Sequence, residues 1–259
     1  MTQPLSFCGS LVKAYDPDRF LLTMFVPEQV RDPSSPAATT RREALWALFA
    51  FNHEIAKTRA VVSEPQLGRI RLQWWRDEIE RIYSGSVVPE HEVLKPLAAA
   101  IRAHDLPRED FETLITAREA DLAGAPLKDL DAVLAYADAT STPLLSLAVR
   151  VCGEDPVPEP VYPVAVNYAL MGILRAAPFL AGRGQGLLPA AGRDDVRAIA
   201  AHVVSGLRPG NRLLRAAHAM AVTHARHLRS CRYDVFSSRF LRPPAFREIR
   251  LFFNFMKGV

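Results

Sequence analysis

The chain has 259 residues, of which 49% are hydrophobic and 23% are charged. Such a chain can bury a sizeable core, and the composition excludes a disordered or fibrous protein. Its uninterrupted apolar runs are far shorter than the roughly 18 residues of a membrane-spanning helix, and its first residues lack the pattern of a secretory signal.

The three cysteines, Cys8, Cys152 and Cys231, are far apart in the sequence and form no CxxC pair. Zinc binding and dithiol redox chemistry usually need such closely spaced thiols. We therefore expect neither of these chemistries, and the scarcity of cysteine fits a reducing compartment.

The net charge of +4 is distributed unevenly along the chain. From Arg193 onward, 13 Lys and Arg residues stand against four Asp and Glu residues, which gives this third +9 and leaves −5 for the first 192 residues. A basic region of this kind suits an anionic lipid surface, nucleic acid or an acidic protein surface, and solvated helix faces explain it at least as often. No nucleic-acid-binding motif accompanies it, so nucleic acid is not an expected partner.

Residues 1–38 are predicted to be a leader with a short helix over 16–24 and a loop over 32–36. Residues 39–259 are predicted to be one domain. Punctuation by Pro, Gly and Ser, together with apolar periodicity, places the helices within it.

The domain begins with a predicted long helix over 41–60, in which apolar residues recur at three- and four-residue steps. Thr40 and Glu43 can form a capping box at its start. Pro65 suits the first turn of a second helix, which continues to about Ser84. Its predicted buried stripe consists of Leu67, Ile70, Trp74, Ile79 and Ile82.

The remaining segments are also predicted to be helical. Pro143 should kink or split one of them, and the Pro-rich residues 157–163 should be a connection. No segment alternates with a two-residue period, so the predicted fold is all-α, with helices around a central cavity. The predicted helices cover 92–104, 108–123, 128–152, 162–181, 193–206, 209–229, 231–241 and 244–257.

Five segments carry recognisable motifs: RREALWALFAF at 41–51, LQWWR at 72–76 followed by Tyr83 and Gly85, Phe111 to Leu122, Leu134 to Gly153, and ILRAAPFLAGRGQGLLP at 173–189. In order and spacing they resemble the squalene/phytoene synthase family over roughly residues 15–240. The resemblance implies a single-domain isoprenoid-synthase-like helical fold around a central cavity.

The chain departs from this family at the positions that carry its chemistry. Active members place two aspartates four residues apart on each of two helices, and these carboxylates hold magnesium ions that bind prenyl diphosphates. The matching positions here are Ala56, Ala60, Ala176 and Leu180. We therefore expect no catalytic residue, no metal site and no cofactor.

Other carboxylates could substitute for the missing aspartates. Glu119 with Asp121 is the best pair, although an internal hydrogen-bonding role for Asp121 is favoured. Glu54 should point away from Ala56, and Asp77, Glu78 and Glu80 should lie on a solvated face. His53 could line the cavity mouth, although a structural role is favoured. The cavity-lining candidates are Phe49, Asn52, His53, Ala56, Ala60, Asp121, Gly172, Arg175, Ala176 and Leu180.

Three functions remain open. The favoured one is a non-catalytic assembly or binding factor, because the chain looks like the branch of the family that includes mitochondrial complex I assembly factors; a respiratory-complex subunit is the partner this implies. The alternatives are a magnesium-dependent head-to-head prenyl transferase and a carrier that holds an isoprenoid or lipid in an apolar cavity. The predicted location is cytoplasmic, with peripheral contact at the inner membrane through the basic C-terminal third.

Overall fold

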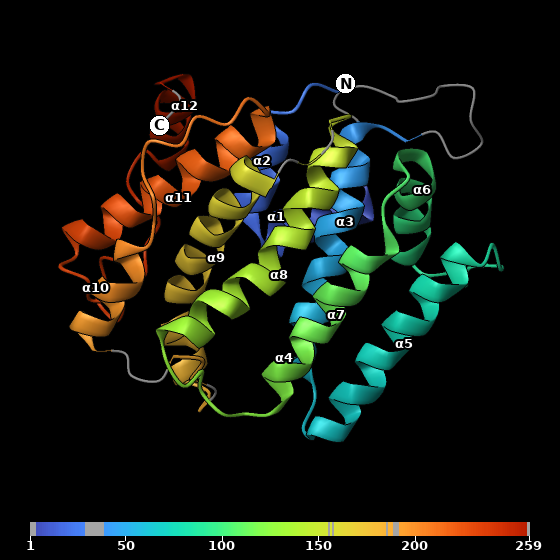
Figure 1. The fold of residues 1–259 in the computed structure, drawn as a ribbon, viewed down its shortest axis with the longest axis horizontal. Coiled ribbons are helices and arrows are strands. Elements are labelled where there is room, and N and C mark those ends of the chain that lie inside the picture. Colours follow the sequence, from blue (N-terminus) through green and yellow to red (C-terminus); the bar gives the residue numbers. More distant parts are fainter. Residues whose placement is uncertain are drawn as a thin grey trace. The chain divides into compact units, whose positions relative to one another are not determined.

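The computed structural model describes residues 4–28, 39–154, 156, 158–184, 186–188 and 192–257. Their regular secondary structure is α-helical, as the sequence predicts (Figure 1). The chain divides into two compact units, one of residues 1–123 and 143–156, the other of residues 124–142 and 157–259. The leader and domain predicted from the sequence divide the chain differently, and the predicted loop at 32–36 lies outside the described residues.

The first unit is organised around α3. This helix packs against α1, α2, α6 and α7, while α5 packs against α7 (Figure 1). The ring of Phe51 on α3 meets the edges of Trp75 and Phe111, at centroid distances of 5.3 and 5.5 Å. The helices are α1 (Phe7–Tyr15), α2 (Pro17–Thr23), α3 (Arg41–Ala56), α4 (Thr58–Val61), α5 (Pro65–Tyr83), α6 (Leu94–His104) and α7 (Arg108–Leu122).

Local sequence signals explain where several of these helices begin. The Thr40 hydroxyl accepts a hydrogen bond from the Glu43 amide at 3.2 Å, which caps α3 as predicted. Pro65 occupies the first turn of α5, also as predicted. The sequence did not predict α1, which Ser6 caps by accepting from the Gly9 amide at 3.1 Å.

The predicted buried stripe of α5 is partly wrong. Leu67, Ile70 and Trp74 are exposed by 49%, 58% and 37%. The buried face carries Gly68 and Trp75 instead, together with Leu72, Ile79 and Ile82. Gly68 lets α7 approach closely, since a Cβ there would lie only 2.4 Å from the Leu122 side chain.

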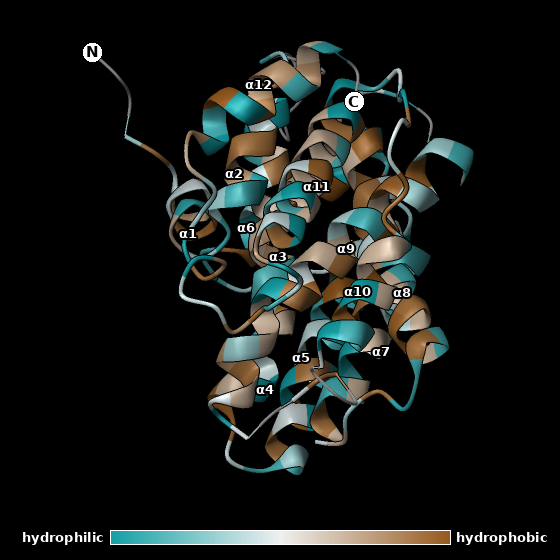
Figure 2. Cartoon of the chain, turned by 90° about the vertical axis from the view of Figure 1, so that its left-hand side faces the viewer, coloured by the Kyte–Doolittle hydropathy of each residue, from teal (hydrophilic) through white to brown (hydrophobic). Residues whose placement is uncertain are grey.

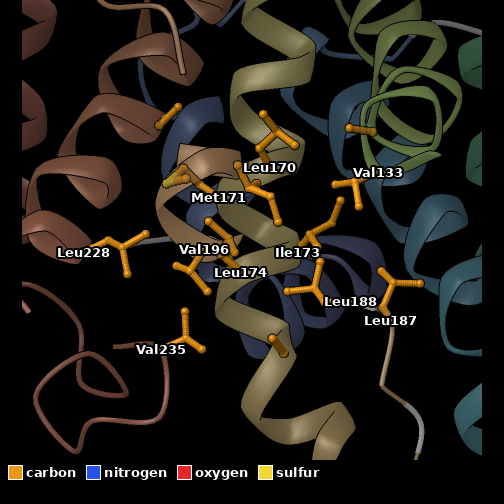
Figure 3. Close-up of a cluster of buried hydrophobic side chains, with 14 of the residues drawn as sticks. Val133, Leu170, Met171, Ile173, Leu174, Leu187, Leu188, Val196, Leu228 and Val235 are labelled. Carbon is orange, nitrogen blue, oxygen red and sulfur yellow. The ribbon is translucent and has the colours of Figure 1, made fainter. Parts of the chain in front are cut away.

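The second unit is organised around α9, which packs against α10 and α11, and α12 packs on α11. Its hydrophobic core surrounds α9, with Leu170, Ile173 and Leu174 pointing among Val133, Val196, Leu188 and Leu228 (Figure 3). The helices are α8 (Leu130–Val151), which contributes residues to both units, α9 (Pro158–Ala181), α10 (Arg193–Ala201), α11 (Arg212–Ser230) and α12 (Arg247–Lys257).

Three predicted boundaries are wrong in this part of the chain. Helix α9 begins at Pro158, within the expected connection at 157–163. First-turn amides have no helical acceptor, so Pro158 and Pro160 cost no hydrogen bond, and the helix also accommodates Pro163 in its interior. Helix α10 ends before 206, where Asn167 pairs with the backbone of Val204 through bonds of 2.8 and 3.0 Å. Residues 231–241 are not helical, because Arg232 and Tyr233 have φ values of 55° and 58°.

Pro143 lies inside α8 without splitting it, and the division between the two units falls at this residue. By length and composition, α8 and the Glu159–Ala181 part of α9 could cross a membrane, but 50% and 56% of their apolar windows are buried within the protein. Core helices pass the same test, so the observation is weak evidence for a membrane span.

Candidate functional site

The first pair of positions assigned to magnesium does not lie on one helix. Helix α3 ends at Ala56, and Ala60 belongs to the short helix α4 after an interruption at Lys57. The prediction of one helix over 41–60 is therefore wrong. The buried Thr58 hydroxyl donates a hydrogen bond to the Glu54 backbone carbonyl at 3.4 Å. A side chain thus satisfies a carbonyl in the last turn of α3.

A buried carboxylate lies close to these positions, but it is already engaged. Glu54 accepts hydrogen bonds from Lys57 Nζ at 2.6 Å and from Arg71 Nη2 at 2.7 Å. Its side chain is only 10% exposed, whereas those of Lys57 and Arg71 are about one-third exposed. Glu54 thus links α3 to α5 instead of presenting a free carboxylate.

A second polar group joins α3 to α7. Arg118 donates to Asn52 Oδ1 at 3.5 Å and forms an ion pair with Asp121 at 3.6 Å. All three side chains are largely buried. Glu119 faces elsewhere and pairs with Arg76 at 3.0 Å, so Glu119 and Asp121 do not converge on one site.

The remaining candidates on α3 take part in packing within the first unit. His53 is half-buried and stacks on Tyr15 at a centroid distance of 4.8 Å. Burial, followed by the charge of Lys57, lowers the pKa of His53 below 6.5. Phe49 is buried, with the Arg19 guanidinium 5.8 Å from its ring centroid.

The second pair of positions lies on α9, in the second unit. Ala176 and Leu180 are partly buried, whereas Gly172 is exposed. Leu180 packs against the hydrophobic core around α9. Beside them, Arg175 Nη1 lies 3.3 Å from Nε2 of the buried His224 on α11.

These residues do not fit a magnesium centre. Alanine and leucine side chains supply no oxygen, which is the ligand that Mg²⁺ requires. Within the described residues, no three His, Cys, Asp or Glu side chains gather closely enough to hold a metal ion. Neither position pair therefore offers a way to hold a diphosphate through magnesium.

The structure also shows polar groups that sequence reasoning missed. Glu78, predicted to lie on a solvated face, is buried and pairs with Arg81 at 3.1 Å. A polar cavity of about 350 Å³ in the first unit is lined by Arg41 and Arg150 and by Asp105 and Glu154, so its charges balance. Arg41 begins the RREALWALFAF motif, but no sequence signal predicts that it lines a cavity with Arg150 and Glu154 at the end of α8.

The chain is similar to known proteins in its sequence and in its fold. A family model described as squalene/phytoene synthase matches residues 12–255. The chain is 26% identical over 185 residues to NADH dehydrogenase (ubiquinone) complex I, assembly factor 6 of Bos taurus, covering 71% of this chain and 52% of that protein. It is 25% identical to the Homo sapiens protein over the same length. The chain thus spans about half the length of these curated relatives.

One curated synthase and two solved synthase structures also match. Presqualene diphosphate synthase of Rhodopseudomonas palustris is 30% identical over 115 residues, covering 44% of this chain and 40% of the enzyme. A crystal structure of a dehydrosqualene synthase in complex with ligand superposes with a TM-score of 0.66 at 12% identity, covering 97% of this chain and 94% of that one. Squalene synthase HpnC from Alicyclobacillus acidocaldarius gives 0.58 at 17% identity, with coverages of 97% and 88%. The predicted all-α, isoprenoid-synthase-like fold is confirmed.

Proposed function

The chain belongs to the squalene/phytoene synthase family, and from this premise we propose that it is a non-catalytic member that serves as an assembly factor for respiratory complex I. The observation that carries the proposal is the similarity to complex I assembly factor 6 proteins across most of this chain. The expected partner is a protein subunit of that complex or of one of its assembly intermediates.

The chemistry of the candidate site supports the non-catalytic part of this proposal. A prenyl diphosphate carries several negative charges, which must be balanced before it can enter an apolar site. Ala56, Ala60, Ala176 and Leu180 cannot bind the metal ions that would balance them. The nearby Glu54 is committed to two cations of its own unit. We infer that the protein works without a resident cofactor.

The assembly role is tested by deleting the gene in the native host. The expected result is loss of assembled complex I on native gels and of NADH:ubiquinone reductase activity, both restored by the wild-type gene. Affinity purification of the tagged protein should recover complex I subunits. A deletion strain with normal levels of assembled, active complex I would overturn the proposal.

The second candidate is a prenyl transferase that condenses two prenyl diphosphates head to head. The similarity to presqualene diphosphate synthase and the shared fold favour it, whereas the four apolar positions oppose it. Magnesium would be required only in this case. Purified protein is incubated with farnesyl or geranylgeranyl diphosphate and Mg²⁺, and no diphosphate release is expected. Diphosphate release that depends on Mg²⁺ would contradict the non-catalytic proposal.

A third candidate, isoprenoid or lipid binding without chemistry, is compatible with the assembly role. The side chains at the four positions are apolar, as a prenyl or quinone tail requires. Native mass spectrometry of the protein purified from its host should show a bound isoprenoid if this candidate is correct. Absence of such a ligand, together with no binding of added isoprenoid, would exclude it.

The proposed location is the cytoplasmic side of the inner membrane, in peripheral contact with the lipid. The basic C-terminal third supports this location, because anionic lipids attract Lys and Arg. Fractionation of host cells should recover the protein with membranes at low salt and release it at high salt.

A further inference from the structure

The C-terminal helix α12 is held in a defined orientation on α11. Leu251 and Phe255 form its buried face. Asn254 donates to Thr223 Oγ1 at 2.8 Å and accepts from Arg226 at 2.9 Å. The Phe255 ring also lies 5.6 Å from the guanidinium carbons of Arg212 and Arg215. These contacts fix which side of α12 faces away from α11.

That other side is apolar as well. We define the α12 apolar face as Ile249, Phe252, Phe253 and Met256, which are exposed by 53%, 52%, 56% and 64%. Their spacings of three and four residues place them within an arc of about 100° on one side of the helix. Packing on α11 explains only the first apolar side. A second one, with four large side chains in water, is typical of an interaction surface.

Basic side chains flank this face on one side of the helix, where Arg250 and Lys257 lie about 100° and 80° around the axis from Ile249. From Phe236 to Lys257 there are five Lys and Arg residues and a single acid, Glu248, which pairs with its neighbour Arg247 at 3.0 Å. The exposed basic residues are Arg239, Arg242, Arg250 and Lys257. Figure 2 shows hydrophobic and hydrophilic segments side by side along α12. Apolar side chains bordered by cations are the pattern of helices that lie in the interface of anionic membranes.

The length of α12 decides how it could meet a bilayer. It has 11 residues, whereas a helix that spans the hydrocarbon core needs about 20. It can therefore lie along the surface but cannot cross it. Arg250 and Lys257 precede and follow the apolar residues in the last turns, where long cationic side chains can reach phosphate groups.

We propose that α12 docks the protein on an anionic lipid bilayer, with the α12 apolar face below the headgroups and Arg250 and Lys257 at the lipid phosphates. A protein surface is the less favoured partner. The exposed cationic side chains of Arg250 and Lys257 are best neutralised by a dense negative charge, which an anionic leaflet supplies. This inference rests on the peripheral location in the proposed function, whereas the assembly role can hold without it.

The test measures sedimentation of the full-length protein with phosphatidylglycerol–cardiolipin vesicles and with phosphatidylcholine vesicles. Binding is expected to the anionic vesicles only. The Phe252→Ser/Phe253→Ser variant should bind at least about tenfold more weakly, because two aromatic side chains no longer enter the interface. Arg250→Glu/Lys257→Glu should weaken binding about as much and reduce its salt dependence.

Matched controls distinguish binding through α12 from nonspecific hydrophobic or electrostatic binding to vesicles. Leu67→Ser/Ile70→Ser removes two exposed apolar side chains of α5, and Arg102→Glu/Lys128→Glu makes the same charge change on other exposed residues. Both should bind vesicles like the wild type. Circular dichroism checks that each variant is folded. As a second readout, brominated lipid should quench the added fluorescence of Phe253→Trp and leave that of Ile70→Trp unchanged.

Several outcomes would overturn the inference: no binding to anionic vesicles, binding that survives both α12 variants, or equal losses in the α5 variant. Cross-linking to a host protein that depends on α12 while vesicle binding does not would identify a protein surface instead. These results are independent of the assembly role. If the wild-type protein does not bind anionic vesicles while α12 variants still restore complex I in the deletion strain, the docking is refuted and the assembly role stands.

Discussion

The junction of α3 with α4 and the end of α9 carry the two sets of positions that the family resemblance assigns to magnesium, and these two regions differ in their surroundings. Beside Ala56, the polar residues Asn52 and Glu54 are bonded to Arg118, Arg71 and Lys57 within the first unit. Around Ala176, the second unit presents mainly apolar side chains, and one polar contact there joins Arg175 to His224.

This difference shows two ways in which a helix can do without metal-binding carboxylates. At α3, charged residues remain, but they compensate one another across helices and so stabilise the unit. At α9, the side chains at the two positions are apolar, and Leu180 packs against the core. We therefore expect substitutions on α9 to act through packing and those on α3 through charge.

Leu174→Ala should give the largest effect, because Leu174 is fully buried in the core around α9. The expected loss is about 2–5 kcal/mol in the free energy of unfolding, from lost burial and from the cavity. Urea denaturation measures it. Leu180→Ala, at a partly buried position, is the control and should cost about 1 kcal/mol. Equal costs would mean that the core does not extend around α9 as described.

Glu54→Gln should give the next largest effect. It leaves Lys57 and Arg71 without their common partner, and the expected loss is about 2 kcal/mol, reduced by the partial exposure of both cations. The control is Glu112→Gln, which weakens the ion pair of Glu112 with Arg76 at 2.6 Å. The Glu112 side chain is 41% exposed, so this change should cost less than about 1 kcal/mol. If both variants unfold at the same urea concentration, charge compensation at the end of α3 is not a source of stability.

The sequence was sufficient for the class of fold because its signals were local. Thr40 and Pro65 mark helix starts through their own hydrogen bonding and geometry, wherever the helix packs. The face that α5 buries was not predictable in this way. Both Leu67–Ile70–Trp74 and Leu72–Trp75–Ile79 have helical spacing, and the fit of Gly68 against Leu122 on α7 favours the second set.

The candidate site was predictable in its residue types but not in its contacts. The alanines and leucine at the four positions can be seen in the sequence, as can nearby acids such as Glu54 and Asp121. Glu54 pairs with Arg71, which lies 17 residues further along the chain, whereas Asp121 pairs with Arg118, which lies three residues before it. Tertiary packing decides between these partners, and a single sequence does not record it.

His218 extends the comparison to the effect of pH. It is fully buried on α11, and neither ring nitrogen has a hydrogen-bond partner among the described residues. Burial, followed by the charge of Arg226, lowers the pKa of His218 below 6.5. The folded state therefore resists protonation, so the stability present above pH 6.5 should fall as the pH drops through 6.5 toward the folded-state pKa.

His218→Leu should remove this contribution and raise the free energy of unfolding by about 1 kcal/mol at neutral pH, because an unsatisfied polar ring is no longer buried. Thermal unfolding from pH 7.5 to 5 measures the change in slope. The half-buried His53 on α3, whose pKa is also lowered, is the control: His53→Leu should leave part of the slope in place. An unchanged slope in His218→Leu would show that folding does not lower the pKa of His218.

The smallest expected effects concern the two acids of α7 that the sequence offers as alternative metal ligands. Asp121→Asn weakens a largely buried pair with Arg118 and should cost about 1 kcal/mol. Glu119→Gln weakens a pair in which Glu119 is 46% exposed, and should cost less than about 0.5 kcal/mol. Because the two acids have different cationic partners, titration calorimetry with Mg²⁺ should give only heats of dilution. A binding heat that both variants abolish would place a metal site on α7. Asp121 and Glu119 would then bind a metal ion instead of pairing with Arg118 and Arg76.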